Sequence, residues 1–331
     1  MKYIAFLTGV LAGMQAFAWG PATHVYLAEG ATKLTRPDVQ FGSILPDMNQ
    51  MILSKPEIME AVRFLTHWEP DRVAPSGLAL GMITHNEAWG ADWYSHQYWL
   101  PETPESTGLY STGKIRHLEA VLAVEPYAAE FLFEFAIEYL LRVDEGRVLG
   151  RKMLAGAAEF GPAKQRMIVE AFAAPLAERV AGLSEEQAEK ELRVASRLFR
   201  FVTETYGAAF VCDETAFFRA LRSFTAFYLH LEPETAGHHL SYAIELCRDD
   251  YRAELDRIRE QLSIDMAAKA PDMIADCAWG CSASADGSAN ATLDPVLGVL
   301  LALGALRLAS RSIFGPARER ADFRKAGNSG T

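Results

Sequence analysis

The sequence of 331 residues predicts an all-α fold built as one multi-helix domain. Apolar residues recur at i, i+3 and i+4 through most of the chain, in segments rich in Ala, Leu, Glu and Arg. The alternating pattern of a half-buried strand is almost absent. Hydrophobic residues make up 50% of the chain, so a domain of this size can bury a substantial core.

The expected helices follow from this periodicity and from their start signals. Pro56-Glu57, Ser76, Ser184 and Pro233-Glu234 place a proline, a capping hydroxyl or an early acidic residue where a helix N-terminus favours it. We expect helices at residues 22–35, 56–65, 76–98, 114–122, 127–144, 148–158, 162–181, 185–206, 214–229, 235–263 and 265–274.

The first 18 residues have the pattern of a secretory signal peptide. Lys2 precedes an apolar run over residues 3–12, and the segment ends in Ala16-Phe17-Ala18. Cleavage there makes Trp19 the first residue of the mature chain, and its new α-amine is able to ligate a metal, which an amide nitrogen is not. We therefore expect an exported protein, periplasmic, extracellular or at the cell surface, whose folded domain covers residues 19–276.

Residues 277–331 form a separate tail in this prediction. They contain Cys277, Cys281, a short apolar segment at 295–306 and a basic end. This layout resembles the bacterial C-terminal sorting tails that are exchanged for a surface anchor; the alternative is an amphipathic helix docked on the domain. Cys212 and Cys247 are candidates for a disulfide in an exported protein.

The negative charge of the chain limits the kinds of partner that it can bind. The net charge is −11 and the isoelectric point is near 5.3, with no basic stripe outside the extreme C-terminus. A protein of this kind lacks the electrostatic footprint that nucleic-acid binding requires. We expect no stable nucleic-acid partner and a monomeric protein.

Candidate metal ligands gather in the first third of the chain. Four of the eight histidines lie between positions 24 and 96. On one continuous helix His85, Asp92 and His96 stand at i, i+7 and i+11, so all three project from nearly the same face. Imidazole and carboxylate ligands at such spacing are typical of a zinc site. The alternative is that Trp19 only packs against the domain and that His24 is an ordinary helix residue.

At these residues the chain resembles the zinc-dependent phospholipase C family, including its glycosylphosphatidylinositol-specific phospholipase D-like branch. The resemblance covers residues 19–101 and extends distantly to the zinc-dependent S1/P1-type nucleases. It is carried by five elements: Trp19-Gly20, Thr23-His24, Pro46-Asp47, Thr66-His67-Trp68 and the segment from Leu80 to His96. It implies an all-helical domain of the zinc phospholipase C / P1 nuclease type.

The resemblance also implies two or three zinc ions. The first would be surrounded by four ligands: Asp47, His67, His85 and Asp92. Trp19, through its amine and carbonyl, and His24 would hold the second, and His96 would contribute to a third. Asp92 would bridge two ions, and Asp47 would orient the attacking water or accept its proton.

Two departures from the family pattern leave alternatives open. The family more often has an Asp one turn after the helix His, where this chain has Trp89, so either the helix holds an insertion or Glu87 takes part. The family also has a His and an acidic residue downstream at i and i+4. Glu134 and Glu138 have that spacing on an apolar helix, and we favour them as ligands. Alternatives are His117 with Glu119 as ligands, or a salt bridge from the carboxylates to Arg142.

The function expected from the resemblance is zinc-dependent hydrolysis of phospholipids at a membrane surface, by attack of a metal-activated water on phosphorus. The sequence leaves the head group and the choice between C-type and D-type cleavage open. A zinc-dependent single-strand nuclease is one alternative. A non-catalytic surface protein with a closed, structural zinc site is another.

Overall fold

The computed structural model describes residues 19–96 and 110–279, and within them it contains helices and no strand. The first half of the described chain forms α2 (Pro21–Thr32), α3 (Pro37–Gly42), the 3-10 helix η1 (Leu45–Met51), α4 (Pro56–Trp68), η2 (Pro70–Arg72), α5 (Gly77–His85), α6 (Ala91–His96), α7 (Tyr110–Leu122) and α8 (Pro126–Asp144). The second half forms α9 (Val148–Glu159), α10 (Pro162–Arg179), α11 (Glu185–Phe210), α12 (Glu214–Tyr228), α13 (Pro233–Cys247), α14 (Tyr251–Lys269) and α15 (Pro271–Trp279). The all-α prediction is confirmed, and these helices make one domain.

The helix starts predicted at Pro56, Ser76, Ser184 and Pro233 are confirmed, and the local reasons are visible. The start predicted at residue 265 is wrong, because α14 continues through it to Lys269. Ser76 accepts a hydrogen bond from the Ala79 amide at the start of α5. Ser184 and Gln187 form a reciprocal capping box at the start of α11. α4 and α13 begin with proline, whose missing N–H would have no helical acceptor there anyway.

Two predicted helices are each broken in the structure. The predicted helix at 76–98 ends at His85, and α6 begins at Ala91 after a turn over residues 86–90. The prediction was wrong because apolar periodicity continued across this short turn. The predicted helix at 235–263 is likewise two helices, α13 and α14, separated by residues 248–250.

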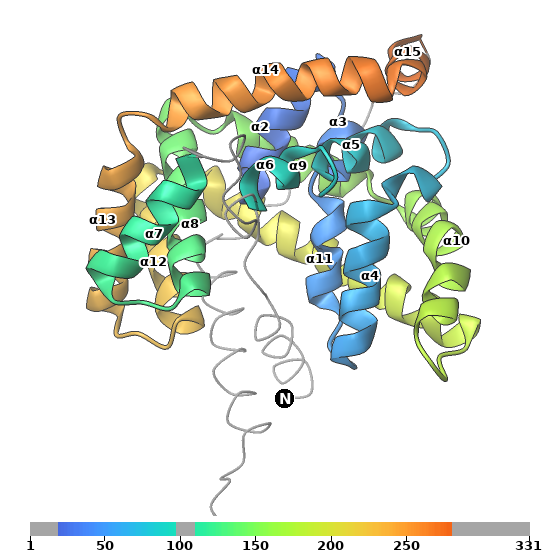
Figure 1. Ribbon diagram of the computed structural model, residues 1–331, viewed down its shortest axis with the longest axis horizontal. Helices are drawn as coiled ribbons and strands as arrows, with labels where there is room; N and C mark the ends of the chain where they lie inside the picture. Colours follow the sequence, from blue (N-terminus) through green and yellow to red (C-terminus); the bar gives the residue numbers. More distant parts are fainter. Residues whose placement is uncertain (1–18, 97–109, 280–331) are drawn as a thin grey trace, which may run out of the picture.

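The helices form two groups with α2 between them (Figure 1). α8 packs against α7, α12 and α13 on one side of the molecule. α11 packs against α9, α10 and η1, and η1 also packs against α4 on the other side. α14 crosses the top of the view and packs on α2. α2 therefore lies in the interior, and nine of its residues are buried.

The predicted tail and disulfide can be compared only in part. α15 runs to Trp279, so it continues past residue 276, and Cys277 is buried within it. Cys281, the apolar segment at 295–306 and the signal segment 1–18 lie outside the described residues. Cys247 is a buried free thiol, so the disulfide considered between it and Cys212 is not formed. Among the described helices, none combines the length and the apolar character needed to cross a bilayer.

Candidate metal centre

The centre is assembled from α2, η1, α4, α5 and α6. His67 lies one residue before the end of α4, and His85 is the last residue of α5. The Thr66 hydroxyl donates to the Pro46 carbonyl at 3.0 Å, which ties α4 to the start of η1 beside Asp47. The Glu87 amide donates to the His67 carbonyl at 3.0 Å, which ties the turn after α5 to the end of α4.

The turn over residues 86–90 brings Asp92 back toward His85. Asn86 caps it, because its side-chain oxygen accepts from the Ala88 and Trp89 amides at 2.9 Å each. A methyl group on Gly90 would lie 2.6 Å from the Asn86 backbone N and O, so the tight approach requires glycine. His85 and Asp92 thus meet through a turn and not along one helix face.

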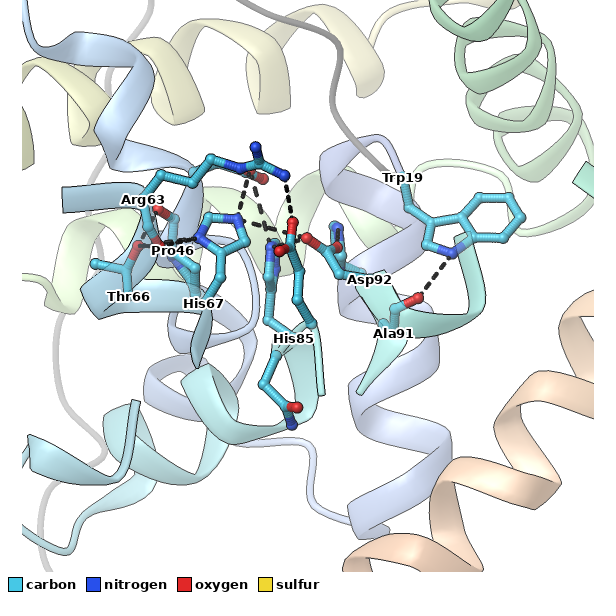
Figure 2. A network of polar contacts seen from close by, with 12 residues as sticks. Trp19, Pro46, Arg63, Thr66, His67, His85, Ala91 and Asp92 are labelled. Atoms are coloured by element: carbon cyan, nitrogen blue, oxygen red, sulfur yellow. Dashed lines mark hydrogen bonds and ion pairs between the residues drawn. The ribbon is translucent and has the colours of Figure 1, made fainter. Parts of the chain in front are cut away.

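Two of the three imidazoles are held by backbone carbonyls. His85 Nδ1 lies 2.7 Å from the Ser43 carbonyl, and His67 Nδ1 lies 3.0 Å from the Arg63 carbonyl. A carbonyl only accepts, so Nδ1 carries a proton, and Nε2 is the nitrogen that offers a lone pair when the imidazole is neutral. Ligating histidines are typically oriented in this way. Both Nε2 atoms face the carboxylates of Asp47 and Asp92. Figure 2 shows His67, His85 and Asp92 turned toward one another.

The Asp92 carboxylate lies between the His24 imidazole and the imidazoles of His67 and His85. Its Oδ1 lies 3.4 Å from His24 Nε2, while its Oδ2 lies 3.4 Å from His67 Nε2 and 3.1 Å from His85 Nε2. The rings of His24 and His85 stack with centroids 4.0 Å apart. One oxygen therefore faces His24 and the other faces His67 and His85, and the bridging role predicted for Asp92 stays a prediction.

The ligand spacing fits a metal ion. Asp47 Oδ1 lies 3.7 Å from His67 Nε2 and 3.8 Å from His85 Nε2. With metal–ligand bonds of about 2.0–2.1 Å, the ligand atoms of a tetrahedral zinc stand about 3.3 Å apart. Three overlapping groups of ligand atoms meet the distance that a shared ion requires: His24, His85 and Asp92; Asp47, His67 and His85; and His67, Glu87 and Asp92. This buried cluster can hold a metal ion.

The protonation of His85 reflects these carboxylates. Burial lowers the pKa of His85, but attraction to Asp92 and Asp47 outweighs burial and raises the pKa to about 9. Without a metal, the cluster therefore holds a proton where a cation would otherwise sit. A metal ion must displace that proton when it binds.

Glu134 is a fully buried carboxylate on α8 beside the cluster. Burial raises its pKa well above the ordinary value, and repulsion from Glu130, Asp47 and Asp92 raises it further. Within the described residues neither carboxylate oxygen has a hydrogen-bond partner. A buried carboxylate without partners is costly, and cation binding is one way to offset that cost. Glu134 does not belong to the three groups of ligand atoms that lie close enough together to hold one metal ion. Its predicted role as a ligand stays a prediction.

Glu138 serves the N-terminus of α2 in this structure. Its oxygens accept from the amides of Ala22 at 3.0 Å and Thr23 at 2.7 Å, from the Thr23 hydroxyl and from the Tyr206 hydroxyl. These bonds cap a buried helix start whose amides otherwise have no acceptor. Its metal role also stays a prediction. The alternative salt bridge is not formed, since Arg142 donates to the Cys212 carbonyl.

The remaining predicted residues differ in how closely they approach the cluster. Trp19 is fully buried, and its indole N–H donates to the Ala91 carbonyl at 3.1 Å, next to Asp92 (Figure 2). His96 is the last residue of α6, and its side chain lies outside the described part of the structure. His117 is exposed, with Nε2 2.9 Å from the Tyr242 hydroxyl, and neither it nor Glu119 belongs to the ligand groups.

Arg63 and Glu87 form an ion pair at the edge of the cluster. Glu87 was an alternative ligand in the sequence, and its carboxylate is close enough to share a metal with His67 and Asp92. Arg63 was not predicted. It stands one helical turn before His67 on α4, and this spacing is the signal that points to it.

Comparison with models of known protein families, with curated proteins and with solved structures gives no match for this chain. The function is therefore inferred from the geometry of the centre and from the sequence resemblance.

Proposed function

We propose that the protein is a zinc-dependent phosphodiester hydrolase that acts on phospholipids, in the manner of a phospholipase C, with the fold of the zinc phospholipase C / P1 nuclease type. The observation that carries the proposal is the convergence of three imidazole Nε2 atoms on two buried carboxylates. Two of those imidazoles already have Nδ1 bound to a backbone carbonyl.

The donor set favours zinc and more than one ion. Imidazole nitrogens with carboxylate oxygens suit Zn²⁺, and the described centre offers no thiolate. Asp47, His67, His85 and Asp92 would hold a first ion. His24 and Asp92 would hold a second, together with Trp19 once the signal segment is removed. His96 and Glu134 remain as candidates for a third.

The chain's own residues then have separate tasks. A zinc ion bound here supplies Lewis acidity toward a phosphate oxygen and makes water a nucleophile near neutral pH. Ser43 and Arg63 keep His85 and His67 in the ligating tautomer through their carbonyls. Asp47 orients the attacking water and accepts its proton. The buried helices around His85 exclude bulk water, which strengthens each electrostatic interaction in the centre.

Phospholipid is the substrate class that the remaining observations favour. The net charge of −11 opposes a long polyanionic partner, so a single phosphodiester held by the metals is the better match. The resemblance assigns a ligand role to five of the six residues in the three groups of candidate ligands: His24, Asp47, His67, His85 and Asp92.

The test is metal content, measured by mass spectrometry on the protein that starts at Trp19, with phosphatidylcholine hydrolysis in the same sample before and after chelation. Two or three zinc ions and chelator-sensitive release of a phosphorylated head group support the proposal. Single-stranded nucleic acid serves as the second substrate, and turnover of that substrate alone would move the assignment to a nuclease. Bound zinc with no turnover would indicate a structural site.

A further inference from the structure

Arg63 lies where the buried cluster approaches the surface. Side-chain exposure is 0% for His85 and 1% for Asp92, 3% for His67 and 6% for Asp47, and then 10% for Glu87 and 38% for Arg63. Of these six residues, Arg63 is the most exposed and its partner Glu87 comes next. A ligand that enters from the Arg63 side meets this group before it reaches the metal ligands.

Glu87 fixes the direction of this guanidinium. Arg63 Nη2 donates to Glu87 Oε1, and the Glu87 amide is itself bound to the His67 carbonyl at 3.0 Å. Figure 2 shows the Arg63 side chain extended over His67 with its guanidinium toward His85 and Asp92. The ion pair with Glu87 therefore keeps the Arg63 guanidinium over the cluster and does not let it point away into solvent.

The guanidinium retains donors for a further acceptor. Arginine has five N–H groups in a planar fork, and Glu87 is its only hydrogen-bond acceptor among the described residues. Burial lowers the pKa of Arg63, while Glu87 and Asp92 raise it above the ordinary value, so the group stays charged. A planar, charged fork with open donors is the typical partner of a phosphate oxygen.

We propose that Arg63 is an anion-binding residue of this centre, which receives a non-bridging phosphate oxygen beside the metals, and that Glu87 is the positioning residue that directs it. The inference rests on the proposed function for the identity of the anion. The carboxylates of Asp47, Asp92 and Glu87 repel an anion from the metal-free centre. Phosphate binding therefore needs both the bound metal and the guanidinium.

The competing explanation is that Arg63 and Glu87 form a structural ion pair with no ligand. The two explanations can be separated because the contact that supports His67 comes from the backbone carbonyl of Arg63, which every substitution keeps. Replacing the side chain removes the guanidinium and leaves that contact in place. Arg72 offers a matched control, since it is a comparably exposed arginine paired with Glu69 outside the cluster.

The experiment titrates inorganic phosphate into the zinc-loaded protein by isothermal calorimetry, for the wild type, Arg63→Met, Arg63→Lys and Arg72→Met, with zinc content measured on each sample. Losing a charge-assisted hydrogen bond should weaken phosphate binding by about tenfold or more in Arg63→Met. Arg63→Lys should fall between that variant and the wild type because it keeps the charge and loses the fork. Arg72→Met should bind phosphate as the wild type does.

Equal phosphate affinity in Arg63→Met and the wild type would overturn the inference, as would a zinc-loaded wild type with no affinity for phosphate. Loss of zinc by both Arg63 variants would assign a structural role and overturn it as well. The titration needs no turnover. If Arg63 contributes to phosphate binding but the protein hydrolyses no phosphodiester, the proposed function alone is refuted. If Arg63→Met keeps both its hydrolysis and its phosphate affinity, this inference alone is refuted.

Discussion

The ligating tautomer of His85 is determined by an atom far away in the sequence, the Ser43 carbonyl, which accepts from Nδ1 at 2.7 Å. His85→Ala should therefore remove a fully oriented ligand together with its two carboxylate contacts. We expect the variant to lose at least one zinc ion and to lose hydrolysis by about 100-fold or more, given the large contribution of metal ions to catalysis. Metal content and phosphatidylcholine turnover, measured on the same preparation, check this.

His117→Ala is the matched control for that variant. His117 is an exposed histidine on α7, and its ring contacts Tyr242. We expect its zinc content and activity to equal those of the wild type. Equal zinc content in His85→Ala and the wild type would contradict the metal assignment of the centre.

The buried charge of Glu134 should make the metal-free protein sensitive to pH. Burial raises the pKa of Glu134 above its ordinary value of 4.5, so the folded state binds the proton of this carboxyl more tightly than the unfolded state does. A raised folded-state pKa contributes stability below the unfolded-state pKa, and this contribution is lost as the pH rises through the folded-state pKa. Metal-free wild type should therefore lose stability as the pH rises above about 4.5.

Glu134→Gln should remove this dependence, because an amide does not ionise. In the metal-free protein at neutral pH we expect it to raise the free energy of unfolding by on the order of 1–3 kcal/mol, with no gain near pH 4. Urea unfolding of the chelated proteins at the two pH values measures the difference. A gain of the same size at both pH values would show that the charge is not the cause.

At the scale of elements, the turn between α5 and α6 determines whether Asp92 reaches His85. Gly90→Ala would place a methyl group 2.6 Å from backbone atoms of Asn86, and backbone cannot move as a flexible side chain does. We expect unfolding stability to fall by about 1–3 kcal/mol, the usual cost of overpacking. Zinc content should fall as well because the turn must shift. Chemical denaturation and metal analysis measure both effects.

Gly113→Ala is the control for this substitution. Gly113 is exposed on α7, and a methyl group there would have no atom within 4 Å. Alanine favours a helix over glycine by about 1 kcal/mol, so this variant should be slightly more stable and keep its zinc. If Gly90→Ala were also slightly more stable and kept its zinc, the close approach of the backbone at the turn would not determine stability or zinc binding.

A second element-scale prediction concerns the start of α2. Glu138 accepts from two amides and two hydroxyls there, so Glu138→Gln should leave at least one donor unpaired and lower unfolding stability by about 1–3 kcal/mol. If its role is that of a cap, zinc content should not change. Tyr206→Phe removes one of the same hydrogen bonds and should lower unfolding stability by less than Glu138→Gln does. Loss of zinc in Glu138→Gln would favour the ligand role that the sequence predicts.

At the scale of the whole molecule, the sequence was informative wherever the deciding signal was local. Ser184 and the initial prolines of α4 and α13 indicated helix starts, and periodicity indicated the fold class. The candidate metal ligands His24, Asp47, His67, His85 and Asp92 were recognisable from their types and motifs. The turn at 86–90, the cap on α2 and the Arg63 guanidinium were not, because each depends on atoms far apart in the chain or on the approach of two backbones.

Zinc should act as a cross-link between distant parts of this domain. Its candidate ligands come from α2, η1, α4, α5 and α6, so ions that bind only the folded state would together stabilise five elements. Binding of this kind adds about 2.7 kcal/mol at a free zinc concentration 100 times the dissociation constant. The Tm should therefore rise with zinc concentration and fall on chelation. In His85→Ala the zinc-dependent rise should be reduced or lost, while His117→Ala should keep it. Differential scanning calorimetry across a zinc series tests this, and a Tm of the wild type that does not depend on zinc would show that the cluster is held by its own hydrogen bonds and packing alone.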